Sequence, residues 1–329
     1  MNRNAIFELL NSSPYPWVRY NTARHLLHLP ESDPRVEKAY RDTVRHPLVK
    51  SEIATCRAWP DPPLKSHKAA GHPIHHLRVL ADLGLSIETP GVRSIVKKIT
   101  GKQGNDGALQ SMVILPGMWG GSNTPDWLWM YCDAPILLHA CLALGVAVSN
   151  PVMKSAIDHL RKLHRDKGYI CASSLQKLRG PGRKDDPCPY ATLLTLRVFS
   201  LLEPEYDMPL CREGTEVLLS HWENRKHYKL RMFGIGTEFM KVKYPFVFYD
   251  ILHVVDVLSH FPWVWQDKRF SELICAIDIK RNVDGFFIPE SVWMAFKGFD
   301  FAQKKEPSHT LTYLVERILE RGKAYGVKR

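Results

Sequence analysis

The chain has 329 residues, of which 45% are hydrophobic and 24% charged, a balance typical of a folded globular protein and not of a disordered or fibrous one. Lys and Arg outnumber Asp and Glu by 45 to 34, and the net charge of +11 favours an anionic partner or substrate, or a merely basic surface. The seven cysteines are scattered and form no CxxC pair, which argues against a disulfide framework and predicts a reducing compartment, the cytoplasm.

Several functional classes lack their sequence signal. The first residues show no secretion-signal core, and the longest apolar run, residues 134–148, contains His139 and is too short to cross a bilayer, so we expect no membrane span. P-loop, GxGxxG, GxSxG and HExxH motifs are absent, and we expect no nucleotide cofactor. Without a long Lys/Arg run, we do not expect nucleic acid as the partner. The sequence leaves the oligomeric state open.

The chain is organised as a repeat of roughly sixty residues. Six helical segments that are apolar over most of their circumference start 55 to 61 residues apart, which predicts buried helices. They span residues 17–29, 72–85, 131–146, 188–203, 249–261 and 309–322.

After five of these segments come a short loop and a more amphipathic, more charged helical pattern, typical of a solvent-facing helix. These patterns span residues 34–47, 90–100, 150–168, 209–226 and 268–282, and residues 3–11 supply a candidate sixth. Three of the turns between the two kinds of helix place Gly107, Gly168 and Gly285 where a positive φ is expected. The runs at 246–249 and 292–296 are ambiguous between helix and strand, and we expect no strand-rich domain.

This alternation, with a Gly-aromatic turn before an apolar helix, resembles the prenyltransferase and squalene-cyclase repeat. The resemblance implies an all-α fold, an (α/α)6 toroid or barrel of six inner and about six outer helices around a central cavity. It also implies that residues 1–329 form a single toroid domain of six helical hairpins.

One segment resembles the zinc-binding segment of the protein prenyltransferase β subunit. Its matching residues are Arg183, Lys184, Asp186, Cys188 and Tyr190, with His309-Thr310 further along. In that family the Asp, the Cys and a His bind zinc, and the cations hold a diphosphate. Here Pro189 displaces Tyr190 by one position, and His309 lies two repeats after Cys188 instead of about one. The acidic motifs of class I and class II terpene enzymes and the Cys-His-Gly motif of lanthionine cyclases are absent.

Cys188 stands beside cations at the expected start of an apolar helix, where the helix dipole favours a thiolate. Asp250 and His309 occupy corresponding positions in the next repeats, so we expect these three side chains at one rim. Three interpretations stay open for them: a zinc site that also uses Asp186, a metal-free catalytic site, or helix capping and packing.

Further candidates lie on the same apolar segments. Asp250 precedes His253 by three residues and is placed to orient its imidazole, with Asp256 three residues beyond; an internal polar network is the alternative. His76 follows His72 by four residues, as in metal-ligating or general-base pairs, although histidines also serve at helix starts. Tyr190 and Tyr249 are candidate proton donors.

The aromatic side chains Trp129 and Tyr131 line a pocket or simply belong to the core, and basic residues such as Lys177 precede the apolar segments. We therefore expect an enzyme that acts on a small or medium organic anion, with a prenyl or other diphosphate as a candidate. The chemistry would be zinc- or thiolate-assisted transfer, lyase or hydrolytic chemistry, with Arg183 and Lys184 on the anion. The alternative is a non-catalytic toroidal protein whose basic face docks an acidic partner or nucleic acid.

Overall fold

The computed structural model describes residues 2–165, 168–175, 177, 186–202, 208–227 and 232–326. Arg183 and Lys184, the predicted anion-binding pair, lie outside these residues. The described part is mainly helical, with fourteen α-helices and four short strands. No helix in it is both long and apolar enough to cross a membrane.

The six predicted apolar helices are all present. They are α2 (Pro16–His25), α5 (Pro73–Asp82), α7 (Ala134–Ala143), α9 (Pro189–Phe199), α12 (Ile251–Leu258) and α14 (His309–Ala324). Every residue of α9 and of α12 is buried, as their continuous apolar sequences require. From α5 onward each of these helices packs on the next one along the chain, through α7, α9 and α12 to α14, and α14 packs on α2. The Asn21 side chain on α2 donates a hydrogen bond to the Asp82 carbonyl on α5 (3.1 Å).

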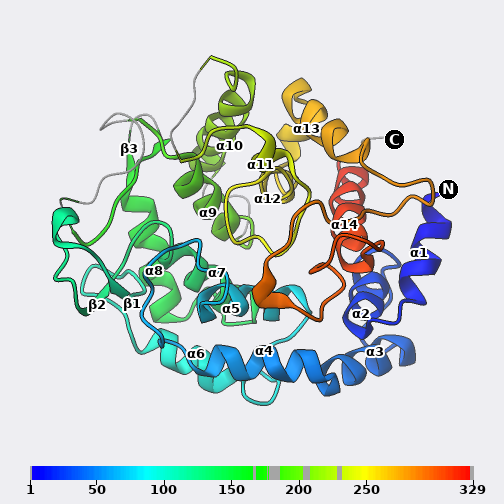
Figure 1. The fold of residues 1–329 in the computed structure, drawn as a ribbon, viewed down its shortest axis with the longest axis horizontal. Coiled ribbons are helices and arrows are strands. Elements are labelled where there is room, and N and C mark those ends of the chain that lie inside the picture. The colour runs from blue at the N-terminus through cyan, green and yellow to red at the C-terminus, as the bar shows by residue number, and fades with distance from the viewer. Residues whose placement is uncertain are drawn as a thin grey trace.

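The six predicted charged helices are also present and lie around the first set (Figure 1). They are α1 (Arg3–Asn11), α3 (Pro34–Arg45), α6 (Val92–Thr100), α8 (Pro151–Lys162), α10 (Met208–Glu223) and α13 (Lys268–Asp278).

Two helices were not expected, α4 (Pro47–Arg57) and the short α11 (Thr237–Met240). Pro47 was interpreted as the end of α3. It is instead the first residue of α4, where a proline needs no hydrogen-bond donor, and His46 Nδ1 caps the new helix by accepting from Leu48 N (3.2 Å).

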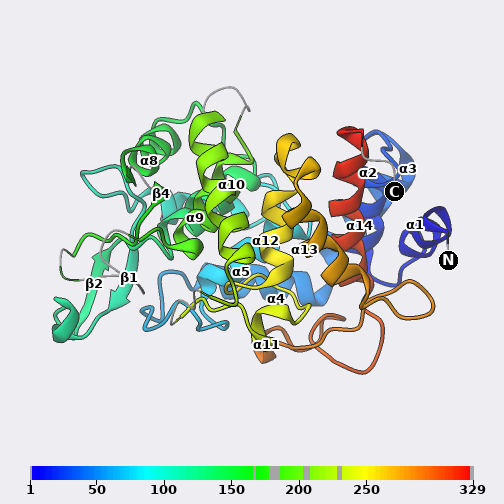
Figure 2. The same ribbon diagram turned by 90° about the horizontal axis from the view of Figure 1, so that it is seen from above.

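The strands form two small antiparallel pairs, neither of them in the runs that looked ambiguous. β1 (Ser111–Ile114) pairs with β2 (Pro125–Leu128), with Ser111 opposite Leu128, and β3 (His164–Arg165) pairs with β4 (Gly168–Tyr169). Three short 3-10 helices span Gly117–Trp119, Pro262–Gln266 and Met294–Phe296. The three turn glycines have φ values of 92° at Gly107, 107° at Gly168 and 81° at Gly285, as predicted. Figure 2 shows the β1–β2 hairpin projecting at one end of the molecule.

The middle of the helix set, which was expected to be a cavity, is filled by side chains. The segment 242–249 before α12 places Tyr244 and Phe246 there, both fully buried. Tyr244 donates to Asp82 (3.0 Å), and the guanidinium groups of Arg78 and Arg197 lie 5.3 and 5.2 Å from the Phe246 ring. The open space for a ligand has to be found elsewhere.

Candidate functional site

A pocket of about 420 Å³ lies over the N-terminal ends of α7 and α9. We call it the thiol pocket, because Cys132, Cys171 and Cys188 all line it. Its remaining walls are mostly apolar and aromatic, which suits an organic ligand. They include Leu64, Leu115, Trp119, Met130, Tyr131, Tyr190, Met232 and Phe233.

Backbone hydrogen bonds between loops hold these walls together. Leu64 N donates to the Met112 carbonyl (2.8 Å), which ties the segment before α5 to strand β1. Tyr131 N donates to the Ala172 carbonyl (3.0 Å), and Cys188 N donates to the Tyr169 carbonyl (2.8 Å). The long loops that supply Leu115 and Cys171 therefore form part of the pocket wall.

Cys188 is the N-cap of α9 and is buried. Its Sγ accepts a hydrogen bond from Ala191 N (3.5 Å). Burial raises the pKa of Cys188 to about 12 and also raises the pKa values of Cys132 and Cys171. Among the described residues, desolvation therefore outweighs the helix dipole and favours the thiol over the thiolate expected from the sequence. The cations of the preceding segment lie outside these residues.

His67 is a pocket residue that the sequence analysis missed. Its ring stacks on Phe248 with centroids 5.5 Å apart, and its Nε2 is buried without a hydrogen-bond partner among the described residues. Burial, assisted by the charge of Lys68, lowers the pKa of His67 to about 4. The imidazole is therefore neutral at pH 7, with its Nε2 unused by the fold. No pattern around His67 marked it, because it lies in an irregular loop.

The predicted tyrosines fall into two groups. Tyr131 and Tyr190 line the pocket, where Tyr131 accepts from Thr195 Oγ1 (3.2 Å) and Tyr190 donates to the Val247 carbonyl (3.2 Å). Tyr249 does not line it; its hydroxyl pairs with His221 Nδ1 (2.9 Å). Burial raises the pKa of all three phenols, so they are hydrogen-bonding groups at neutral pH.

Two lysines supply positive charge at the pocket. Lys65 and Lys177 line it and are exposed, so each ammonium group is free to meet an anion at the mouth. Lys177, predicted from the sequence to be a basic loop residue, lies at the pocket wall with Lys65.

Asp250 and His253 do not form the predicted carboxylate–imidazole pair. Asp250 is the N-cap of α12, and its Oδ1 accepts from the backbone N of His253 (3.0 Å). The His253 ring lies between the Phe248 carbonyl at Nδ1 (3.0 Å) and the Arg78 guanidinium at Nε2 (2.5 Å). Since the guanidinium can only donate, Nε2 accepts and Nδ1 carries the proton. This arrangement is the internal polar network that was the alternative.

Three other predicted residues lie away from the thiol pocket. His76 pairs with buried Glu52 (2.5 Å) and stacks on Phe296, while His72 caps α5. Trp129 donates to Asp106 (2.5 Å) and packs against His159. None of these side chains is among the residues that line the thiol pocket.

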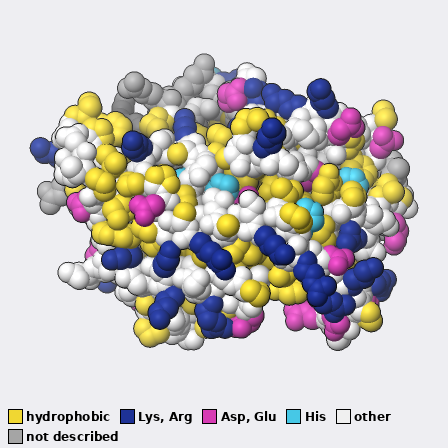
Figure 3. Space-filling view, turned by 60° about the horizontal axis from the view of Figure 1, so that its bottom comes forward, with side chains coloured by type: hydrophobic (Ala, Val, Ile, Leu, Met, Phe, Trp, Pro, Cys, Tyr) yellow, Lys and Arg dark blue, Asp and Glu magenta, His cyan; other side chains and the backbone are white. Residues whose placement is uncertain are grey.

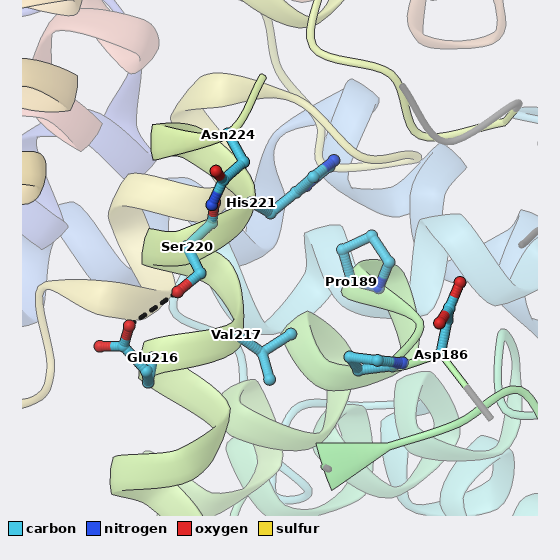
Figure 4. Close-up of a pocket in the computed structure, with 8 residues that line it drawn as sticks. Asp186, Pro189, Glu216, Val217, Ser220, His221 and Asn224 are labelled. Carbon is cyan, nitrogen blue, oxygen red and sulfur yellow. Dashed lines mark hydrogen bonds between the residues drawn. The ribbon is translucent and has the colours of Figure 1, made fainter. Parts of the chain in front are cut away.

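The predicted zinc ligands do not come together. Asp186 lines a different pocket, of about 370 Å³, opposite residues of α10 such as Ser220 and His221 (Figure 4). His309 lies between the rings of Tyr15 and Phe286, and Ser308 is the cap of α14. Across the described ranges, no three His, Cys, Asp or Glu side chains are grouped so as to hold a metal ion. The described residues thus do not fit the predicted zinc site.

No protein-family model and no curated protein sequence matches the chain. Solved structures with a similar arrangement include variants of the type II terpene cyclase MstE from Scytonema. One of them, in complex with geranylgeranyl dihydroxybenzoate, has a TM-score of 0.44 and a sequence identity of 10%. The match covers 94% of this chain and 87% of that chain. Another, in complex with merosterolic acid A, has a TM-score of 0.45 and 10% identity over the same shares. A similarity this distant does not by itself assign an activity or a site.

Proposed function

We propose that the protein is an enzyme that takes an apolar organic substrate with an anionic leaving group, such as an allylic prenyl diphosphate, into the thiol pocket. The observation that carries this proposal is the composition of the pocket: apolar and aromatic walls, two exposed lysines, and a buried imidazole nitrogen without a partner. The hydrocarbon would lie against Tyr131, Tyr190 and Phe233, and the diphosphate would meet Lys65 and Lys177.

The pKa shifts distinguish between two of the reaction classes that the sequence left open, lyase and transfer chemistry. An imidazole with a pKa of about 4 is too weak a base to take a proton from a thiol with a pKa of about 12, so a thiolate nucleophile is not favoured. The same imidazole is basic enough to deprotonate a carbocation. We therefore favour lyase chemistry over transfer.

In this reaction the C–O bond breaks and its electron pair leaves with the diphosphate. The faces of Tyr131 and Tyr190 would stabilise the allylic cation. His67 Nε2 would then accept a proton from the carbon next to the cationic centre, and the C–H electron pair would form the new double bond. The products are a diene and diphosphate, with no change in oxidation state.

The architecture around the pocket is part of the same proposal. We propose that the six buried helices form the inner ring, and the charged helices the outer ring, of one (α/α)6 toroid that spans residues 1–329. The cyclic order of packing and the Asn21–Asp82 hydrogen bond support a closed ring. The three cysteines that line the thiol pocket are free thiols, which supports the proposal of a reducing, cytoplasmic location.

The test uses geranyl diphosphate and, as an uncharged control, geraniol. We expect wild-type protein to bind the diphosphate more tightly, and to release inorganic diphosphate together with a hydrocarbon detectable by gas chromatography. His67→Gln should lower the rate by about 100-fold or more while leaving binding in place. Lys65→Ala with Lys177→Ala should weaken binding at least tenfold.

Exposed residues supply the matched controls, His227→Gln for His67 and Lys304→Ala with Lys305→Ala for the lysine pair. The proposal fails if geraniol binds as well as its diphosphate, or if wild-type protein releases no diphosphate. Tight binding of unchanged geranyl diphosphate would instead indicate a protein that binds such a ligand without catalysis.

A further inference from the structure

Three outer helices that lie next to one another carry a strong excess of positive charge. α3, α4 and α6 together contain nine Lys and Arg but only three Asp and Glu. One of those acids, Glu52, is buried against His76 and does not reach the surface. The basic side chains of these helices are exposed, and we call them the basic stripe: Arg35, Lys38, Arg41, Arg45, Lys50, Arg57, Arg93, Lys97 and Lys98.

The acids near the stripe are already neutralised. Glu37 pairs with Arg41 (3.4 Å), and Asp42 is taken by Arg19 (3.1 Å). At the ends of the stripe, Asp33 pairs with Arg35 (2.8 Å) and Glu88 with Arg93 (2.5 Å). Considering only the described residues, the side chains of Lys38, Arg45, Lys50, Arg57 and Lys97 form no ion pair.

The helices arrange these cations in a line. α3 packs on α4 and α4 on α6, and only His46 separates the first two. Lys98 Nζ donates to the Arg57 carbonyl (2.7 Å) and so ties α6 to the end of α4. Figure 1 shows the three helices in a row along one edge of the molecule, and Figure 3 shows a row of Lys and Arg side chains across the face that includes this edge. A line of like charges held on rigid helices matches a polymer with evenly repeated negative charge.

The lack of exposed apolar side chains on the basic stripe indicates which kind of anionic partner it fits. None of the large exposed hydrophobic side chains of the described chain lies on α3, α4 or α6. An interfacial membrane helix needs such side chains to enter the lipid, and single-stranded nucleic acid is usually bound by stacking on exposed aromatic rings. A duplex needs neither, because its phosphates are met by Lys and Arg alone.

We propose that the basic stripe is a docking surface for the phosphate backbone of a duplex nucleic acid. Contacts of this kind position the duplex without reading its sequence. The proposal is independent of the thiol pocket, which lies over the ends of α7 and α9, and either one can fail without the other. It also revises the expectation that nucleic acid is not a partner, which was based on the lack of a continuous Lys/Arg run.

The experiment measures binding of a short fluorescent DNA duplex to the full chain by anisotropy over a series of salt concentrations. Wild-type affinity should fall steeply as salt rises, because each neutralised phosphate releases counterions. The variant Lys38→Glu/Lys50→Glu/Lys97→Glu should bind at least tenfold more weakly. Its slope of log K against log salt should be smaller by about 3, one unit for each lost phosphate contact.

The matched control is Lys154→Glu/Lys162→Glu/Lys226→Glu, which makes the same change in net charge at exposed lysines on or after α8 and α10. It should keep most of the wild-type affinity. Circular dichroism checks that both variants are folded. The proposal would be overturned if both variants lost duplex affinity equally, or if the wild type did not bind the duplex. Preferential binding of phosphatidylserine vesicles or of a single strand would overturn it in favour of another partner.

Discussion

Burial shifts the pKa values of Cys188 and His67 in opposite directions. Both line the thiol pocket, and burial penalises the charged form of each. The thiol therefore holds its proton to a pKa of about 12, while the imidazole gives up its second proton at about 4. At neutral pH the pocket offers neutral hydrogen-bonding groups, which suits it to hydrocarbon and not to a resting thiolate.

The reactivity of the thiols tests this description of the pocket. With iodoacetamide at pH 8, we expect exposed Cys275 to be alkylated well before buried Cys188. Below its pKa, the rate at Cys188 should rise about tenfold per pH unit, because only the thiolate reacts. Peptide mass spectrometry measures both sites in one sample, with Cys188→Ser as the control for peptide assignment. Equal alkylation rates of the two cysteines at pH 7 would contradict a buried, protonated Cys188.

Three helix starts of the buried set share one structural role. Cys188 caps α9, Asp250 caps α12 and Ser308 caps α14, each by accepting a hydrogen bond from a backbone N three residues on. The rim of candidate ligands predicted from the sequence is therefore a series of capping residues at two of its three positions, with His309 next to the third cap. Capping explains the spacing of these three positions, since each of these repeats starts its buried helix at the same point.

Asp250, the cap of α12, should make the stability of the fold depend on pH. Burial raises the pKa of Asp250 from its ordinary 3.8 to about 7, with the charge of Lys243 opposing the shift. As pH rises from 4 to 7 the unfolded chain loses this proton before the folded chain does, so stability falls across that window. Asp250→Asn keeps a good cap without the charge and should gain stability over wild type as pH rises, by up to about 4 kcal/mol.

Urea unfolding of both proteins at several pH values from 4 to 8 checks this, because the difference between them isolates Asp250. Asp250→Ala is the companion variant and should lose about 1 kcal/mol of capping at pH 4. If the difference in unfolding free energy between Asp250→Asn and wild type stayed constant with pH, the pKa of Asp250 would be the same in the folded and unfolded chains.

Arg78 connects segments that are far apart in the chain. It lies on α5, donates to the Phe246 carbonyl (2.5 Å) and to His253 on α12 (2.5 Å), and is almost completely buried. It therefore joins one side of the helix set to the segment that fills the middle and to the opposite side. A buried cation of this kind is retained only where its partners are in place.

Replacing this arginine should weaken the whole fold. Arg78→Met keeps most of the volume but leaves two buried acceptors without a donor, and we expect a loss of about 3–5 kcal/mol in the free energy of unfolding. Arg57→Met, at an exposed position of the basic stripe, is the control and should change stability by less than about 0.5 kcal/mol. Differential scanning calorimetry and urea titration measure both. Similar stabilities for the two variants would mean that Arg78 does not organise the interior.

The helical part of the fold was readable from sequence because it depends on local pattern. Six continuous apolar segments and six amphipathic ones have the period of a helix, and each contains a helix. The segment predicted over 150–168 is helical only as far as Lys162, and His164–Arg165 forms strand β3 instead. α4 was missed because a proline starts a helix as readily as it ends one, and only the cap at His46 distinguishes the two. The β1–β2 hairpin was missed because its pairing joins residues on either side of an irregular loop.

The sites were decided by tertiary structure. Sequence alone identified Cys188, Tyr131 and Tyr190, which do line one pocket, and also Asp250 and His253, which do not line it. It could not identify His67 or Lys65, since no spacing relates them to the helix repeat. Whether a side chain near a helix start faces a pocket, caps the helix or pairs with a distant arginine depends on which loops pack beside it. Burial then sets its charge, which is why Cys188 carries a proton where its sequence neighbours suggested a thiolate.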